Sequence, residues 1–253
     1  MVSDVGPHYD AEFYTTFSDG SRASAAVIVP LVNQLVQPAS VLDVGCGTGA
    51  WLAEWTRDGV TDVLGVDGDY VARAAMQIDQ AKFRAVDLRN PLSLDRRFDL
   101  VESLEVAEHL DEACADQFVQ SLVRHADTVL FSAAIPGQGG IHHVNEQWPS
   151  YWINRFNREG YKLFDIIRPI IWADARIETW YRQNVLLFSR TLALPATATC
   201  IDLVHPELWR GRQGPPALTL RQVAKALPAA TGKAVRYRRN RAIARVRSRL
   251  RNS

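Results

Sequence analysis

Short apolar segments alternate with amphipathic segments through most of the first 190 residues of the chain. The apolar segments are rich in Val, Leu and Phe, as is typical of buried strands, and most of the segments between them have helical periodicity. Alternating strands and helices predict a parallel sheet. The first five predicted strands are Val41–Val44, Val63–Val66, Phe83–Val86, Phe98–Ser103 and Thr128–Ser132.

Three of the predicted helices have recognisable ends. One begins near Gly49 and stops at Gly59, because a glycine favours the left-handed backbone that ends many helices. The other two are predicted at Glu112–His125 and at Trp148–Glu159, and Gly160 follows the second of these. Proline at the second position of the last segment suits the first turn of a helix.

Two further strands are predicted after the fifth, at Tyr161–Ile167 and Asn184–Ser189. The tight spacing of the last strand predicts an antiparallel insertion at the sheet edge. The sequence therefore predicts a doubly wound α/β fold. Its sheet is expected to be seven-stranded and mostly parallel, with an antiparallel last strand and with helices on both faces.

The chain length of 253 residues allows one substantial core with a small appendage. We expect a domain over residues 1–194, which includes an N-terminal helical cap, and a basic C-terminal extension over residues 195–253. Pro195–Thr199 has the composition of a linker. No segment is apolar enough to span a membrane and the N-terminus lacks a signal pattern, so we expect a cytoplasmic protein with its three cysteines reduced.

The formal net charge of +1 hides an uneven distribution of charge along the chain. Residues 208–253 hold 13 lysines and arginines and no acid, whereas the residues before them hold 16 basic and 28 acidic side chains. Ile243, Val246 and Leu250 have helical spacing within this basic tail. We expect the tail to contact its own acidic body, a second copy of the chain or a partner protein; anionic lipid and RNA are the other options.

The most specific motif is SVLDVGCGTG, in which the first strand ends near Asp43 and a tight glycine turn leads into a helix. Glycines let the backbone approach a ligand closely, and the N-terminus of the helix offers unpaired amides to an anionic group. Asp67 closes the second strand, where it is placed to accept hydrogen bonds from ribose hydroxyls. These features indicate a nucleotide-type cofactor.

The segments VLDVGCGTG, GVDGD, AVDL and FDLVESLEVAEHL, in this order and spacing, resemble the motifs of class I S-adenosylmethionine-dependent methyltransferases with a Rossmann-like fold. They are similar to those of bacterial small-molecule and sugar-pathway methyltransferases. The resemblance extends over about residues 8–190 and implies S-adenosylmethionine as the cofactor. The matching positions are Asp43, Gly45, Gly47 and Gly49 for the methionine part, Asp67 for the ribose, and Asp87 with Leu88 for the adenine.

The N-terminal aromatic segment of this family closes over the cofactor, which makes Tyr14 a candidate, together with Tyr9 and Ser24. The alternative is a helix that packs its aromatic side chains on the core. Glu105 follows the fourth strand and is a further candidate for lining the cofactor pocket.

The fourth strand leads into LEVAEHL, which places Glu105, Glu108 and His109 at the C-terminal edge of the sheet. The resemblance to small-RNA 2′-O-methyltransferases and ubiquinone-pathway O-methyltransferases implies that these residues bind a divalent cation together with His143. Metal-free relatives have similar sequences, so S-adenosylmethionine alone is the favoured cofactor and the metal is the alternative.

His143 and His109 are the candidate catalytic residues, because imidazole titrates near neutral pH and can remove a proton from an acceptor hydroxyl. His143 is preferred, since it follows the fifth strand among polar and aromatic residues, and His142 is regarded as a bystander. The transfer needs little more than alignment of nucleophile and methyl group, so a dedicated base is not obligatory.

The segment ETWYRQN before the last strand resembles the acceptor-side edge of sugar-pathway methyltransferases. Arg182 is expected to bind a phosphate or carboxylate, and Trp180 or Tyr181 to stack on a sugar ring; a buried edge is the alternative. The predicted function is O-methylation of a sugar or another small metabolite. The alternatives are an RNA 2′-O-methyltransferase and a non-catalytic scaffold that binds S-adenosylmethionine.

Overall fold

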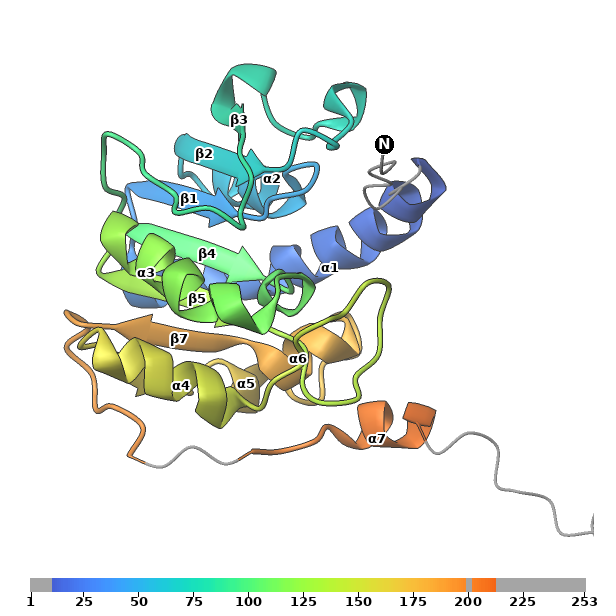
Figure 1. Ribbon diagram of the computed structural model, residues 1–253, viewed down its shortest axis with the longest axis vertical. Coiled ribbons are helices and arrows are strands. Elements are labelled where there is room, and N and C mark those ends of the chain that lie inside the picture. Colours follow the sequence, from blue (N-terminus) through green and yellow to red (C-terminus); the bar gives the residue numbers. More distant parts are fainter. Residues whose placement is uncertain (1–10, 199–201, 213–253) are drawn as a thin grey trace, which may run out of the picture. The chain divides into compact units, whose positions relative to one another are not determined.

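The computed structural model describes residues 11–198 and 202–212. They include a seven-stranded sheet in the order β3-β2-β1-β4-β5-β7-β6 (Figure 1). All neighbouring strands run parallel except β7, which is antiparallel to both β5 and β6. The strands are β1 (Ser40–Val44), β2 (Asp62–Asp67), β3 (Phe83–Ala85), β4 (Leu100–Leu104), β5 (Thr128–Ser132), β6 (Lys162–Phe164) and β7 (Leu186–Ser189).

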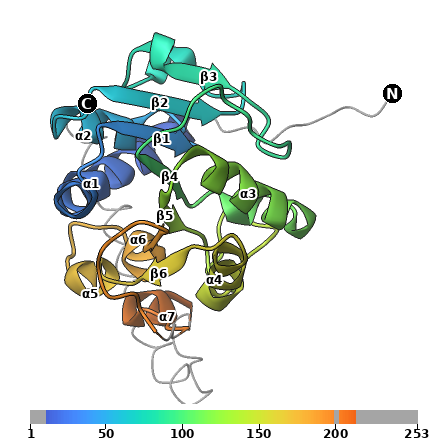
Figure 2. The same cartoon turned by 90° about the vertical axis from the view of Figure 1, so that its left-hand side faces the viewer.

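Helices cover both faces of this sheet, as predicted (Figure 2). One face carries α3 (Ala115–His125) and α4 (Pro149–Arg158). The opposite face carries α1 (Ala11–Val36), α2 (Ala50–Arg57), α5 (Arg168–Ile171) and α6 (Thr179–Asn184). Short 3₁₀ turns lie at Arg73–Ala75, Gln80–Lys82, Ala107–His109 and Glu112–Cys114, and α7 spans Pro206–Arg212.

Each face of the sheet has its own hydrophobic core. On the face of α3 and α4, Phe156 stacks on Phe188 with ring centroids 4.0 Å apart, and the Phe131 ring meets the Phe156 ring edge-on. On the opposite face, Trp55 of α2 and Ile28 of α1 are fully buried. Two cores back to back hold the central strands rigidly, because every residue of β1, β4 and β5 is buried.

The predicted α/β fold is confirmed, and several details differ. The antiparallel strand β7 lies between β5 and β6, so that β6 forms the sheet edge. Asn184, predicted as the start of that strand, is the last residue of α6. The predicted strand at Phe98–Ser103 starts at Leu100, because the Phe98 amide bonds to the carbonyl of His125 instead of to a neighbouring strand.

The segment after β7 packs on the sheet and helices. Thr197, in the predicted linker, donates its amide to the carbonyl of Leu163, and Asp202 accepts from the amide and hydroxyl of Ser150 in the first turn of α4. The first of the two compact units of the chain ends at Leu208. The predicted tail helix at Ile243–Leu250 lies outside the described residues. Among the described helices, none is long and apolar enough to cross a membrane.

Candidate active site

The glycine turn between β1 and α2 has the geometry that the motif predicts. Gly45, Gly47 and Gly49 have positive φ angles of 90°, 51° and 83°. A Cβ on Gly45 would lie 2.3 Å from Cγ2 of Val106, and one on Gly49 would lie 2.9 Å from Cγ1 of Ile78. A Cβ on Gly47 would meet nothing within 4 Å, so the turn packs tightly at its ends and leaves open space at its centre.

Asp67 is the last residue of β2 and joins the glycine turn to the second strand. Its Oδ2 accepts from the amide of Gly47 at 2.7 Å, and its Oδ1 accepts from the Tyr70 hydroxyl and the Gly68 amide, both at 2.6 Å. Burial raises the pKa of this carboxyl, while these hydrogen bonds lower it. Two carboxylate oxygens have about four lone-pair sites, so Asp67 keeps capacity to accept from a ligand hydroxyl.

Two more carboxyl groups are buried beneath the turn. Asp43 of β1 lies directly opposite Glu102 of β4 in the parallel register. The Glu102 side chain is fully buried and accepts from Nε1 of Trp55 at 2.9 Å. Burial raises the pKa of Glu102 to about 8, and burial followed by the charges of Glu102 and Asp67 raises the pKa of Asp43 well above its usual range.

The other cofactor candidates lie in different surroundings. Asp87 follows β3, is exposed and binds the Arg89 guanidinium, which lowers the pKa of the Asp87 carboxyl. Leu88 beside it is half-buried against the core on the α3 side. Ser24 is fully buried and accepts from the Glu178 amide, so it fastens α1 to the start of α6. Tyr14 lies in α1, but its side chain, like Tyr9, lies outside the described residues.

Glu105 lies at the C-terminal end of β4 in a hydrogen-bonded cluster. Its φ angle is 56°, which a non-glycine residue rarely adopts, and strain of this kind gathers at functional sites. Its carboxylate accepts from Nδ2 of Asn184 at 3.0 Å and from Nε2 of Gln138 at 2.9 Å. The same Nδ2 donates to Oε1 of Gln138, so three segments distant in sequence meet at Glu105.

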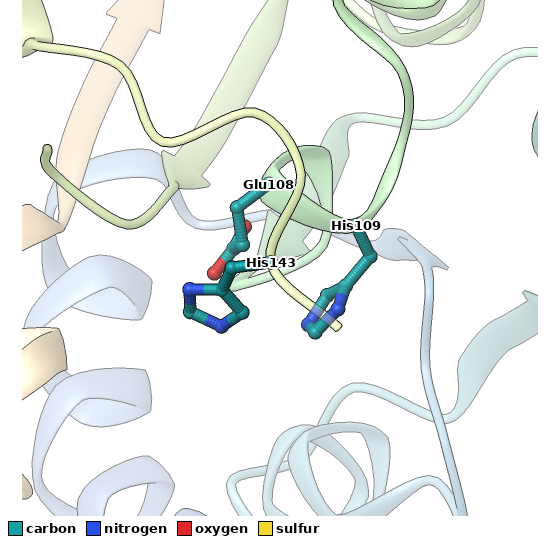
Figure 3. Close-up of side chains that lie close together, drawn as sticks. All are labelled: Glu108, His109 and His143. Carbon is teal, nitrogen blue, oxygen red and sulfur yellow. The ribbon is translucent and has the colours of Figure 1, made fainter. Parts of the chain in front are cut away.

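Glu108, His109 and His143 come together in space, as Figure 3 shows. One possible ligand atom from each of the three lies within 4.8 Å of the others. Glu108 is fully buried and neither of its carboxyl oxygens has a hydrogen-bond partner; Nδ1 of His109 has none either. Glu105, a predicted ligand, is not part of this group and binds the two amides instead.

The two imidazoles of this cluster pack edge to face. The ring centroids of His109 and His143 lie 4.9 Å apart at an interplanar angle of 89°. Burial, and then the neighbouring His143, lower the pKa of His109 to about 4, so its imidazole is neutral near pH 7. Nδ1 of His143 lies 2.9 Å from Oε1 of Glu146. Both histidines therefore suit proton transfer or metal binding, and His142 beside them is exposed.

A family model described as a methyltransferase domain matches residues 18–165. The chain belongs to this methyltransferase family. The resemblance of the motifs to methyltransferases is thereby confirmed.

One curated relative of this methyltransferase is a malonyl-[acyl-carrier protein] O-methyltransferase of Pseudescherichia vulneris, 29% identical over 141 residues. The match covers 54% of this chain and 55% of the relative, so the chain spans about half the length of the curated protein that it matches.

Solved structures share the fold at low sequence identity. DesVI of Streptomyces venezuelae is 16% identical with a TM-score of 0.56, over 71% of this chain and 96% of that one. CalS10 of Micromonospora echinaspora, an amino pentose methyltransferase solved with S-adenosylmethionine, is 16% identical with a TM-score of 0.52, over 74% and 99%. At these identities the similarity establishes the fold alone.

The acceptor-side residues of this methyltransferase differ from expectation. The Arg182 guanidinium is buried and binds Glu207 and the Thr179 hydroxyl, so it is not available for a substrate phosphate. Tyr181 is buried as well, with its ring against the Trp51 ring at 5.1 Å. Both side chains are buried, but they belong to the helix α6 and not to an edge strand. Nothing in the sequence marks Arg182 as the partner of an acid 25 positions away.

Three residues of the site were not singled out by the sequence. Glu102 is a charged residue inside an apolar strand, and that isolated charge was a usable signal. Gln138 and Glu146 lie in the loop after β5, and their contacts depend on how that loop folds.

Replacing Glu102 by glutamine tests the buried carboxyl. The pKa of Glu102 is about 8 when folded and about 4.3 when unfolded, so stability is greatest below the lower value and is lost as pH rises through the upper one. E102Q keeps an acceptor for Trp55 without the proton linkage. We expect E102Q to exceed the wild type by about 1 kcal/mol or more at pH 8, a Tm gain of roughly 2–4 °C.

Thermal unfolding followed by circular dichroism from pH 5 to pH 9 measures this difference. Exposed Glu112→Gln serves as the matched control and should leave the pH profile unchanged. Parallel pH profiles for E102Q and the wild type would contradict the assignment.

Proposed function

We propose that this methyltransferase transfers the methyl group of S-adenosylmethionine to a hydroxyl of a sugar or another small metabolite. One observation carries the proposal: the glycine turn with Asp67 and the cluster of Glu108, His109 and His143 follow strands of one parallel sheet at the same edge. A cofactor over the turn and an acceptor beside the imidazoles are then neighbours. The curated relative is an O-methyltransferase, which supports an oxygen acceptor.

In this proposal the cofactor binds over the glycine turn. Gly47 admits the methionine part, Asp67 accepts from the ribose hydroxyls, and Asp87 with Leu88 meets the adenine. The carboxyls of Asp43 and Glu102 lie buried beneath the turn and have raised pKa values, so they hold protons unless a cation compensates their charge. S-adenosylmethionine carries a sulfonium and an ammonium group, which would provide such compensation.

The acceptor in this proposal is not an anion at its reacting end. Arg168 and Arg182 are the buried arginines near α6, and their guanidiniums are engaged by Asp165 and Glu207. Glu105 and Glu108 lie at the sheet edge instead. The two engaged guanidiniums therefore offer no free cation to an RNA phosphate, which disfavours an RNA substrate relative to a neutral hydroxyl compound.

His143 acts as the general base in the proposed reaction. Methyl transfer is an in-line displacement in which the acceptor oxygen attacks the methyl carbon and the sulfur leaves as a neutral thioether. The hydroxyl proton passes to the His143 imidazole as the oxygen–carbon bond forms. His109 stays neutral near pH 7 beside it, because burial keeps its pKa at about 4.

A divalent cation bound by Glu108, His109 and His143 is the second candidate for the same cluster. The observation that favours it is the buried Glu108 carboxyl, whose two oxygens have no hydrogen-bond partner. Such a group is costly to bury unless a proton or a cation compensates its charge. Mixed oxygen and nitrogen donors suit Mn²⁺, Fe²⁺ or Zn²⁺. When bound, the cation would orient the acceptor hydroxyl and lower its pKa.

Asp67→Asn tests the cofactor assignment. We expect S-adenosylmethionine affinity, measured by calorimetry, to fall about tenfold or more, because a hydrogen bond to a charged group contributes about 1.5–3 kcal/mol. Asp69→Asn changes an exposed neighbour in the same loop and should leave the affinity unchanged. Equal affinities for D67N and the wild type would refute the ribose contact.

His143→Ala tests the base. Loss of a general base lowers turnover by about 10²–10⁴-fold, whereas S-adenosylmethionine affinity should stay within about twofold. Turnover is measured with labelled cofactor on a panel of sugars and other small hydroxyl compounds. His142→Asn is the matched control, because asparagine tolerates the positive φ of 60° at that position. A parallel loss of affinity in H143A would assign His143 to the cofactor pocket.

Chelation separates the base from the cation. With EDTA-treated protein we expect Mn²⁺ to bind in calorimetry if the triad is a metal site, and Glu108→Gln to abolish that binding. Glu112→Gln should leave it intact. Full methyl transfer in EDTA, with no Mn²⁺ binding, would exclude the cation and leave His143 as the base.

The remaining expectations stay predictions. These are the cytoplasmic location, and the contact of the basic C-terminal extension with a partner or a second copy.

A further inference from the structure

The loop between β5 and α4 builds a binding site for one carboxylate from its own backbone. Gly137 and Gly139 have positive φ angles of 74° and 69°, which favour glycine at both positions. The amide of Gly137 donates to Oε2 of Glu146, and the amide of Gly139 donates to Oε1 at 2.7 Å. Two amides two residues apart thus donate to the two oxygens of one carboxylate. Each carboxylate oxygen of Glu146 therefore accepts one backbone amide of this loop.

The carboxylate held in this way meets the imidazole of His143. Oε1 of Glu146 lies 2.9 Å from Nδ1 of His143, and the side chains are only 17% and 12% exposed. Since both carboxylate oxygens already accept from amides, Oε1 is an acceptor for the ring as well. Nδ1 then carries the hydrogen, and in the neutral imidazole Nε2 carries the lone pair.

Gly140 lets its backbone lie close to one face of the His143 ring. An ideal Cβ on Gly140 would lie 2.2, 2.4 and 2.7 Å from Nε2, Cε1 and Cδ2 of His143. The lone pair of Nε2 points away from the ring within the ring plane. A Cβ placed along that lone pair would be about 1 Å farther from Cε1 and Cδ2 than from Nε2. The missing Cβ therefore lies over the ring face, and the in-plane direction of Nε2 is not blocked by Gly140.

The loop is also fastened to the segment after β4. The amides of Val144 and Asn145 donate to the carbonyl of Glu108 at 2.9 and 3.0 Å. The His109 ring then meets the His143 ring edge to face. The imidazole of His143 is thus constrained at Nδ1, at one face and by a neighbouring ring, which is more than packing of a surface loop requires.

We propose that Glu146 is a positioning residue for methyl transfer: held by the amides of Gly137 and Gly139, it keeps His143 in the tautomer with hydrogen on Nδ1 and a bare Nε2. The role of Nε2 rests on the proposed function, in which the base removes the acceptor proton through this nitrogen. The tautomer of His143 does not depend on the proposed function. A carboxylate that orients a working histidine in this way commonly contributes 10–100-fold to activity or metal affinity.

The tautomer is read by ¹⁵N–¹H correlation spectra of the imidazoles in the EDTA-treated full chain at one pH, with His143→Asn assigning the signal. In the wild type we expect Nδ1 of His143 to resonate as a protonated nitrogen and Nε2 as a bare one. Glu146→Ala should move the ring toward the opposite tautomer. Glu146→Gln should retain much of the wild-type pattern, because its amide oxygen still accepts from Nδ1.

Kinetics provide the second measurement. We expect E146A to lower kcat about 10–100-fold with KM for S-adenosylmethionine nearly unchanged, and E146Q to recover part of the loss. Glu112→Gln is the control for an exposed carboxylate of the same type. Gly140→Ala, whose Cβ would meet the His143 ring, should lower kcat in the same direction.

The outcomes separate the positioning role from the reaction. The same His143 tautomer in E146A and the wild type, with E146A folded by its Tm, would overturn the role of Glu146. A changed tautomer in an enzyme that methylates no acceptor would uphold it and contradict the proposed function instead. If E146A does not fold, E146Q provides the test instead. An unchanged kcat in E146Q, together with hydrogen on Nε2 of His143 in the wild type, would overturn the proposal.

Discussion

The parallel pairing of β1 with both β2 and β4 is the constraint on which the candidate site depends. Paired parallel strands leave the sheet at one edge, so the residues that follow them must meet there. The glycine turn, Asp67 and the segment from Glu105 are brought together by this geometry. The buried strands and the two cores keep that edge in place while its loops carry the polar groups.

The electrostatics of this edge follow from the same pairing. The register sets Asp43 beside Glu102, and the end of β2 adds Asp67, so carboxyl groups accumulate where water is excluded. Without compensation the buried acids keep their protons, and the raised pKa values of Asp43 and Glu102 express that cost. A cofactor with a sulfonium group would compensate the charge of such an acid, and the neutral sulfur of its thioether product would not.

The acceptor side is assembled from segments that are distant in sequence. Asn184 reaches Glu105 from 79 positions away, and Asp202 reaches Ser150 from 52 positions away. The segment at 202–208 also binds α6, where Gln183 donates to the carbonyl of Leu203 and Arg182 pairs with Glu207. The position of Asn184, and through it that of Glu105, therefore depends on residues that follow the last strand of the sheet.

The order of strands and helices, the glycine turn and the acids that follow it were determined by the sequence itself, because they depend on local periodicity and on backbone angles that glycine favours. The same is true of the proximity of Glu108, His109 and His143, since parallel strands must end at a common edge. Only the tertiary structure determined which partner each of these side chains contacts. It placed the Glu105 carboxylate against two side-chain amides and paired Arg182 with Glu207. It also left both carboxyl oxygens of Glu108 without a hydrogen-bond partner.

It also placed β7 inside the sheet and folded the loop after β5 so that Glu146 meets His143. Contacts of this kind join residues through the relative position of whole elements. No local propensity encodes that position, and for that reason the sequence predicted several candidate residues but neither the partners Gln138 and Glu146 nor the pairing of the groups.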